Sequence, residues 1–227
     1  MADRKSRTIR PPVAGKSASQ PKNDLGPLIK TVTWPAGQVI HRIHLGLYGG
    51  SAFNPGIVGN ARFSPIQNAA GASIPTLYGG TTFDFAAMET VFHDVPIAPG
   101  LKTFDQAKLA EQVYSTVTPR RDLVLADLSS TALRSLGLRR SDLIDTEKDQ
   151  YPGARKWAEA IHEQCPAIEG LCWVSRQDDR ARAVVLFGDR IPASDLALAG
   201  ATRSILSDIE LFSDLLILAD RIGVNVV

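Results

Sequence analysis

The sequence has few of the residues that build metal sites or disulfide frameworks. Its 227 residues include two cysteines, Cys165 and Cys172, which lie on either side of Pro166 and Gly170. No second pair of Cys or His stands at the spacing of zinc ligands, so we expect no metal site. Buried, reduced thiols are the expected state of both cysteines, as in cytoplasmic proteins.

Long hydrophobic runs are missing as well. No stretch approaches the roughly 20 apolar residues that a membrane span requires. No early apolar run is long enough for a signal peptide. We therefore expect a cytoplasmic protein without membrane contact.

Several well-known catalytic and nucleotide-binding motifs are also absent. The chain has no GxxxxGK[ST] loop, and no GxGxxG follows a strand into a helix. The four histidines do not form an HExxH pattern, and no sharp turn presents a nucleophilic serine of a Ser-His-Asp or SxxK enzyme. For each histidine taken alone, a surface or structural role is favoured over a catalytic one.

The formal charge is nearly balanced but unevenly distributed. The net charge is +1, so no overall field favours nucleic acid, and we expect no direct nucleic-acid binding. Basic residues, prolines and serines crowd residues 1–30, where Asp3 and Asp24 are the acidic residues. We interpret residues 1–30 as an arm that is flexible or docked on a partner, and residues 31–227 as a single domain.

The rest of the chain predicts an α+β fold. Short strands and helices occur without regular βαβ alternation, which argues against a doubly wound sheet. Capping signals and helical spacing indicate where helices begin. Strands are expected at 28–33, 38–47, 123–128, 170–175, 183–187 and 224–227, helices at 85–92, 104–117, 131–136, 152–164 and 207–221, and long loops at 48–76.

Glu89 is a carboxylate on the apolar side of the predicted helix 85–92. Carboxylates are almost never fully buried unless they are paired, because desolvation is costly. An inward-facing Glu89 therefore indicates a lined pocket, or else the neutralisation of a buried arginine such as Arg62. The apolar side itself comprises Phe85, Ala86, Met88 and Phe92.

Four further polar residues are embedded in apolar or glycine-rich sequence: Arg42, Arg62, Tyr78 and Ser175. Each also has a structural interpretation when taken alone. For Arg42, a position at a sheet edge with the guanidinium in water explains the sequence about as well as a binding role does. Tyr78 before two glycines fits turn packing, and Ser175 fits a hydroxyl at a strand end.

Together these motifs resemble the RES-domain proteins. Arg62 in GNARFSP, Tyr78 in LYGG and Glu89 in AAMETVFH follow the family pattern. Ser175 in LCWVSR also follows it, and Arg42 in HRIH is similar to an additional N-terminal arginine of the family. The resemblance covers roughly residues 38 to 195.

The resemblance implies an ADP-ribosyltransferase-like core of short mixed strands with surrounding helices. Such a domain binds NAD+ as a co-substrate and breaks the bond between nicotinamide and ribose. The resemblance implies that Glu89, Arg62 and Tyr78 are catalytic. It implies that NAD+ is bound by Arg42, Arg62, Tyr78 and Ser175.

The resemblance also implies a biological role. RES-domain proteins are toxins of type II toxin–antitoxin pairs, and the expected partner is a cognate helical antitoxin with a DNA-binding domain. ADP-ribose passes either to a cellular protein, as in a mono-ADP-ribosyltransferase, or to water, as in an NAD+ glycohydrolase. The long loops at 48–76 and the basic arm favour a transferase that recognises a protein. A non-catalytic binding module is the remote alternative.

Overall fold

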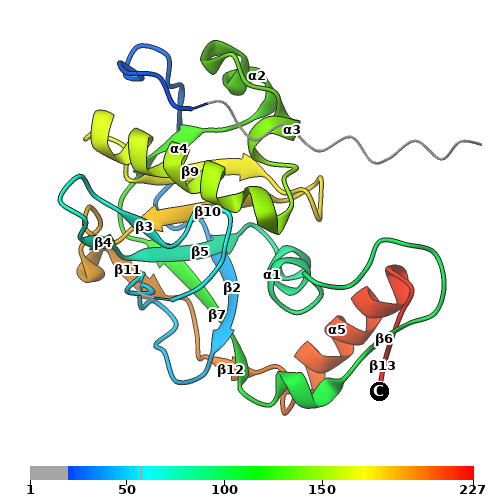
Figure 1. Cartoon of the computed structure of the whole chain (residues 1–227). Coiled ribbons are helices and arrows are strands. Elements are labelled where there is room, and N and C mark those ends of the chain that lie inside the picture. Colours follow the sequence, from blue (N-terminus) through cyan, green and yellow to red (C-terminus); the bar gives the residue numbers. More distant parts are fainter. Residues whose placement is uncertain (1–19, 57) are drawn as a thin grey trace, which may run out of the picture.

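The computed structural model describes residues 20–56 and 58–227, which form a mixed sheet with helices packed around it (Figure 1). The sheet has nine strands in the order β1-β8-β9-β10-β5-β2-β7-β11, and β12 also pairs with β7. All neighbours are antiparallel except the parallel pair β8 and β9. The strands are β1 (Thr31–Trp34), β2 (Ile40–Leu45), β5 (Thr76–Gly80), β7 (Gln112–Pro119), β8 (Leu123–Asp127), β9 (Gly170–Val174), β10 (Arg182–Phe187), β11 (Leu196–Leu198) and β12 (Arg203–Ser204).

Helices and two small strand pairs complete the fold. In Figure 1 the helices α2, α3 and α4 lie together on one side of the sheet, while α5 stands apart beside β6 and β13. The α-helices are α1 (Phe83–Thr90), α2 (Ser130–Leu133), α3 (Arg140–Leu143), α4 (Tyr151–Gln164) and α5 (Ile209–Arg221). The short 3-10 helices are η1 (Gln106–Leu109), η2 (Arg134–Leu136), η3 (Lys148–Gln150) and η4 (Ala193–Asp195). The small pairs are β3 (Ile66–Gln67) with β4 (Ser73–Ile74), and β6 (Lys102–Phe104) with β13 (Val224–Val226).

The central strands are buried on both faces of the sheet. Along β10, Val185 and Phe187 belong to one apolar cluster, whereas Val184 and Leu186 belong to the cluster on the opposite face. This alternation follows from the two-residue period of a strand. A strand packed on both sides gives a rigid support for the residues at its ends.

The predicted α+β class agrees with this architecture, but the predicted helix at 104–117 is wrong. Residues 112–119 form β7, which pairs along its length with β2 and is a central strand. Val113, Thr116 and Val117 are β-branched and favour a strand. Residues 106–109 form only the short helix η1, which begins at Asp105, whose carboxylate accepts from the N–H of Ala107.

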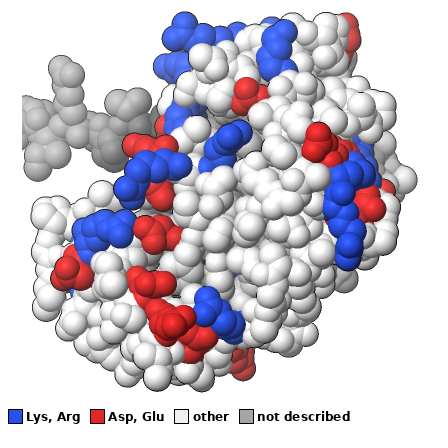
Figure 2. All heavy atoms as spheres, turned by 180° about the vertical axis from the view of Figure 1, so that it is seen from behind, with Lys and Arg blue, Asp and Glu red and all other residues white. Residues whose placement is uncertain are grey.

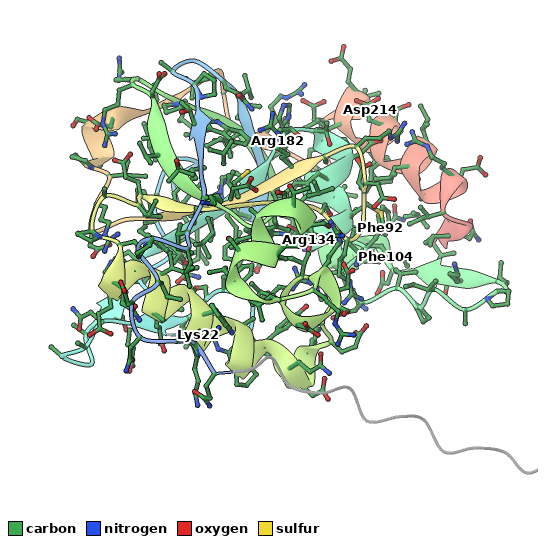
Figure 3. All side chains as sticks on the ribbon, turned by 90° about the horizontal axis from the view of Figure 1, so that it is seen from above. Lys22, Phe92, Phe104, Arg134, Arg182 and Asp214 are labelled. Atoms are coloured by element: carbon green, nitrogen blue, oxygen red, sulfur yellow. The ribbon has the colours of Figure 1, made fainter. Side chains whose placement is uncertain are left out.

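Residues 20–30 pack against the domain. Leu25 is fully buried in the main core, and its N–H donates to Oε1 of Gln164 at 2.8 Å. Lys22 lies beside α4, where its carbonyl accepts from the Gln164 amide (Figure 3). Residues 1–19 of the predicted arm lie outside the described residues, so a flexible or partner-docked arm stays a prediction.

The charged residues follow no single-sign pattern on the face opposite to that of Figure 1. Figure 2 shows blue and red side chains lying next to one another across that face. This mixture agrees with the formal charge of +1. In the part of the chain that the structure describes, every helix is too short or too polar to cross a bilayer.

The strands β2 and β5 separate almost as soon as they meet. They pair at a single position, His41 opposite Gly80. A Cβ atom on Gly80 would lie 2.2 Å from Cδ1 of Phe85 and 2.7 Å from the Arg182 carbonyl oxygen. Gly80 therefore lets the first turn of α1 pack directly on the sheet, and it places α1 beside the opening between the two strands.

Replacing Gly80 tests this close contact. We expect Gly80→Ala to lower the free energy of unfolding by about 1–3 kcal/mol, because the added methyl overpacks the contact with Phe85. Gly26→Ala is the matched control, since a Cβ at Gly26 meets no atom within 4 Å. Urea unfolding of both variants measures the difference, and equal stabilities would contradict the tight packing described here.

Candidate active site

A cleft of about 370 Å³ opens where β2 and β5 part, beside α1. Its size falls in the range of small-molecule sites. Four of the residues singled out from the sequence line it: Arg42, Arg62, Tyr78 and Glu89. The fifth, Ser175, lies directly behind Glu89. The other lining residues are His41, Ile43, Asn54, Ala61, Gly79, Phe85, Ala86, Thr90, His93, Tyr151 and Trp173.

Helix α1 carries Glu89 to the cleft. The helix begins at an N-cap, Thr82, whose hydroxyl accepts from the N–H of Phe85 at 3.1 Å. Phe85, Ala86 and Glu89 all line the cleft, since residues three and four positions apart share one face of a helix. The predicted inward direction of Glu89 is therefore confirmed.

The apolar side of α1 differs in one residue from the prediction. Ala87 is fully buried, whereas Met88 is only partly buried. Phe92 is buried as expected and packs edge-on against Phe104 at 5.5 Å, which ties the end of α1 to β6 (Figure 3). An ion pair of 2.8 Å between Asp84 and Arg221 holds the other end to α5. The helix that bears Glu89 is thus fixed at both ends.

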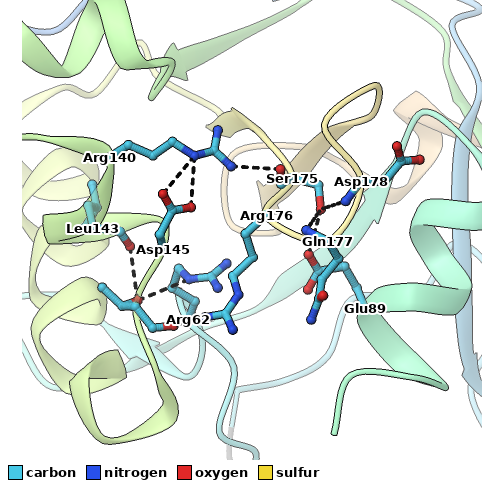
Figure 4. A network of polar contacts seen from close by, with 10 residues as sticks. Arg62, Glu89, Arg140, Leu143, Asp145, Ser175, Arg176, Gln177 and Asp178 are labelled. Carbon is cyan, nitrogen blue, oxygen red and sulfur yellow. Dashed lines mark hydrogen bonds and ion pairs between the residues drawn. The ribbon is translucent and has the colours of Figure 1, made fainter. Parts of the chain in front are cut away.

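Ser175 orients the carboxylate of Glu89. Its hydroxyl donates to Oε1 of Glu89 at 3.0 Å and accepts the N–H groups of Gln177 at 2.9 Å and Asp178 at 3.2 Å (Figure 4). A serine hydroxyl has one proton and two lone pairs, so these three bonds use its full capacity. Ser175 is fully buried. We therefore propose that it positions Glu89, in place of the direct contact with NAD+ implied by the family resemblance.

A second set of contacts holds the turn that contains Ser175. Arg140 donates to the Ser175 carbonyl at 2.8 Å and forms an ion pair with Asp145. Arg176 donates to the carbonyl of Thr146. The same Thr146 accepts from Nε of Arg62 at 3.4 Å (Figure 4). One short segment after α3 thus contacts both the turn behind Glu89 and a cleft arginine.

The role of Ser175 has a kinetic signature. We expect Ser175→Ala to lower kcat for the NAD+ cleavage implied by the RES resemblance by about tenfold, since a lost hydrogen bond to a charged group costs about 1.5–3 kcal/mol. The KM for that substrate should stay unchanged, because Ser175 is fully buried and is not among the residues that line the cleft. Steady-state kinetics separates the two parameters. A raised KM with an unchanged kcat would instead show that Ser175 contacts the substrate.

Arg62 is a buried cation without a carboxylate partner among the described residues. It is 4% exposed, and its guanidinium lies 5.3 Å from the ring centroid of Tyr151. Its Nη2 atom is buried without a hydrogen-bond partner in that part of the chain. No ion pair with Glu89 is present there. The interpretation of Glu89 as a neutralising partner of Arg62 is therefore not supported.

Arg42 lies at the same cleft on β2. Its Nη1 donates to the carbonyls of Gly50 and Ala52, each at 2.9 Å, while Nε has no partner among the described residues. Arg42 is 9% exposed, so the interpretation as an edge residue with its head in water is wrong. Burial lowers the pKa of Arg42 to about 10, so the guanidinium stays charged at neutral pH.

Tyr78 contributes its ring and its hydroxyl to the cleft. It lies within strand β5, so turn packing does not explain it. The Phe63 N–H donates to its hydroxyl at 2.7 Å, and its ring packs edge-on against Trp173 at 6.2 Å. Burial raises the pKa of Tyr78, so the phenol is neutral and keeps a proton that it can donate.

The cleft residues combine unpaired donors with a single acidic group. Arg42 Nε, Arg62 Nη2 and Trp173 Nε1 are buried side-chain donors without a hydrogen-bond partner in the described chain. Glu89 is the one acidic residue among the described residues that line the cleft. Buried polar groups are normally satisfied. This arrangement fits a ligand that carries both hydrogen-bond acceptors and a positive charge.

Some cleft residues were not expected from the sequence. His41 and His93 line the cleft, although a structural role was favoured for each histidine. Nδ1 of His41 lies 2.5 Å from the Tyr114 hydroxyl, and burial lowers the pKa of His41. His93 follows Glu89 by four residues and lies just beyond the end of α1 at Thr90. The described residues contain no group of three metal-binding side chains.

A sequence model of the RES domain matches residues 39–206, about three quarters of the chain. The chain belongs to the RES-domain family. The matched range includes all five polar residues that carried the resemblance, from Arg42 to Ser175. The segment that follows Leu206, with α5 and β13, lies beyond the matched RES domain.

The fold of this RES domain is similar to that of a solved protein. A chain in the crystal structure of the M. tuberculosis MbcT–MbcA toxin–antitoxin complex superposes with a TM-score of 0.58 at 14% sequence identity. The match covers 83% of this chain and 92% of that chain. No curated protein matches the sequence. The predicted α+β fold with a core of short mixed strands is confirmed.

Proposed function

We propose that this RES domain binds NAD+ in the cleft and breaks the bond between nicotinamide and ribose. The observation that carries the proposal is the placement of two buried arginines and one carboxylate around a single cleft. NAD+ has a matching distribution of charge, with an anionic pyrophosphate and a cationic nicotinamide ring. Membership of the RES-domain family supports the same substrate.

Glu89 is proposed to act on the reacting sugar. Loss of nicotinamide leaves positive charge on the ribose, which resembles the charge that glycosidases stabilise with carboxylates. Glu89 is positioned by Ser175 before the reaction begins. A preorganised carboxylate stabilises this charge more strongly as the bond breaks, which lowers the barrier without tighter binding of the substrate.

Arg42, Arg62 and Tyr78 are proposed to bind and orient NAD+. A guanidinium presents several donors in a planar fork that matches phosphate oxygens. Arg42 and Arg62 both retain an unpaired N–H group. The neutral Tyr78 supplies an aromatic ring and a hydroxyl proton near the reacting end.

The proposed biological role is that of a toxin in a toxin–antitoxin pair. The similar solved structure is a toxin–antitoxin complex, which supports an antitoxin partner for this chain. We propose a cognate helical antitoxin with a DNA-binding domain. Expression of the chain alone should arrest growth, and co-expression with the product of the neighbouring reading frame should restore it.

We further propose that ADP-ribose passes to a cellular protein, with hydrolysis to free ADP-ribose as the alternative. The loops between β2 and β5 border the cleft at Asn54 and Ala61 and offer a surface for an acceptor. The purified chain is incubated with labelled NAD+ and cell lysate. A discrete labelled protein supports transfer, whereas free ADP-ribose with unlabelled protein supports hydrolysis. Unchanged NAD+ would refute both activities.

A further inference from the structure

A second hollow adjoins the cleft. It has a volume of about 380 Å³ and shares two walls with the cleft, His93 and Tyr151. The two spaces therefore lie side by side, with these two side chains between them. The remaining walls of the second hollow are Asp94, Val95, Pro96, Ile97, Glu147, Lys148, Arg176 and Gln177.

His93 has the hydrogen bonds of a general base. Its Nδ1 lies 2.7 Å from Oδ1 of Asp94, and its Nε2 lies 3.3 Å from the Tyr151 hydroxyl. With Nδ1–H donating to the Asp94 carboxylate, Nε2 keeps a lone pair that accepts the Tyr151 proton. A separation of 3.3 Å is long for a bond from a hydroxyl. Another hydroxyl can therefore take the place of Tyr151 at Nε2.

The charges of the second hollow are paired within the protein. Lys148 lies 2.6 Å from the Asp94 carboxylate, and Arg176 lies 3.1 Å from that of Glu147. One end of the hollow is apolar, with Ile97 85% exposed. A space with paired charges and an apolar rim favours an uncharged acceptor group on a partly apolar segment over a free anion or cation.

We propose that the second hollow holds the acceptor of ADP-ribose, a serine or threonine hydroxyl of a protein, and that His93 is the base that deprotonates it. This inference rests on the proposed cleavage of NAD+ in the adjoining cleft. A hydroxyl is a weak nucleophile until a neighbouring base takes its proton. His93 stands at the boundary of the two spaces, where the acceptor and the ribose meet.

The proposed step balances without another reactant. The acceptor oxygen forms a bond to the ribose carbon that carried nicotinamide. The bond from that carbon to the ring nitrogen breaks, and its electron pair leaves with neutral nicotinamide. The hydroxyl proton passes to Nε2 of His93, while Nδ1–H remains bonded to Asp94. Release of that proton to water restores the neutral imidazole.

Two variants test the role of His93 with N-acetylserine amide as the acceptor probe. His93→Ala is expected to lower the rate of serine amide modification by about 10²-fold, the usual contribution of a general base. Affinity for NAD+ should be retained, and added imidazole should restore part of the rate. Asp94→Asn should also slow the transfer. Its side chain is 74% exposed, so the exchange leaves folding intact.

The pair His162 and Asp189 supplies matched controls. Nε2 of His162 lies 2.8 Å from the Asp189 carboxylate, and neither residue lines the cleft or the second hollow. His162→Gln and Asp189→Asn should transfer ADP-ribose at the rate of the unaltered chain. Full transfer activity in both His93→Ala and Asp94→Asn, or a lack of imidazole rescue, would overturn the role of His93.

Ile97→Asp tests the position of the acceptor. Because Ile97 is almost fully exposed on the rim of the second hollow, this change should raise the KM for the serine amide and leave the KM for NAD+ unaltered. An unchanged KM for the serine amide would place the acceptor elsewhere. Free ADP-ribose as the sole product of the unaltered chain would refute the acceptor site while leaving NAD+ cleavage intact. Absence of any NAD+ turnover would refute the proposed function itself.

Discussion

Glu89→Gln should lower kcat for NAD+ cleavage by about 10³-fold, the upper range for loss of one preorganised electrostatic contact in a transition state. The neutral amide has nearly the same shape but carries no charge to stabilise the ribose as nicotinamide leaves. Binding of NAD+ should be retained, because the effect arises in the transition state. The rate of nicotinamide release gives kcat, and isothermal titration calorimetry gives the affinity for NAD+.

Glu210→Gln is the control for this variant. Glu210 lies on α5 with its side chain 88% exposed, outside the cleft. The Glu210→Gln exchange should leave kcat for NAD+ cleavage unaltered. A Glu89→Gln protein that folds, binds NAD+ and cleaves it at the normal rate would refute the central role of Glu89.

Arg62→Met should weaken NAD+ binding by about 10²-fold, since loss of one buried charged contact with a ligand costs about 2–5 kcal/mol. The side chain makes few contacts that the fold needs, because its bond to Thr146 is long at 3.4 Å. Methionine keeps the apolar volume and packs against Tyr151. The unfolding midpoint should change little, and the dissociation constant for NAD+ should rise.

Arg121→Met provides the control for a lost guanidinium. Arg121 forms ion pairs with Glu169 and Asp195 outside the cleft. Its removal should leave NAD+ affinity unaltered. An Arg62→Met protein with normal affinity for NAD+ would show that Arg62 serves the fold and does not contact the pyrophosphate.

Local patterns in the chain predicted several elements well. The spacing of Trp157 and Ile161 indicated a helix over 152–164, and α4 occupies Tyr151–Gln164 with both residues buried. Glycine-rich and charged turns delimited the two strands that became β9 and β10. Such features depend on neighbouring residues, which interact in the same way in many folds.

The helix predicted at 104–117 failed because a long-range pairing outweighed the local pattern. Phe104, Ala107 and Val113 stand at helical spacing, yet β7 pairs with β2 from Ile40 opposite Val117 to Leu45 opposite Gln112. β2 lies more than sixty residues earlier in the chain. Nothing within the segment reveals a partner at that separation, although its β-branched residues favour a strand over a helix.

The order of motifs in the chain was sufficient to place the protein in a family and to name Arg42, Arg62, Tyr78 and Glu89, because residue types and helical spacing are local properties. Their arrangement around one cleft depends on the parting of β2 and β5 and on the fit of Gly80 against Phe85. The same holds for the hydrogen bond from Ser175 to Glu89, which exists only after the turn that follows β9 has packed against α1. Positions, bonds and unpaired donors at this site are products of contacts between distant segments, and these form only when the whole chain has folded.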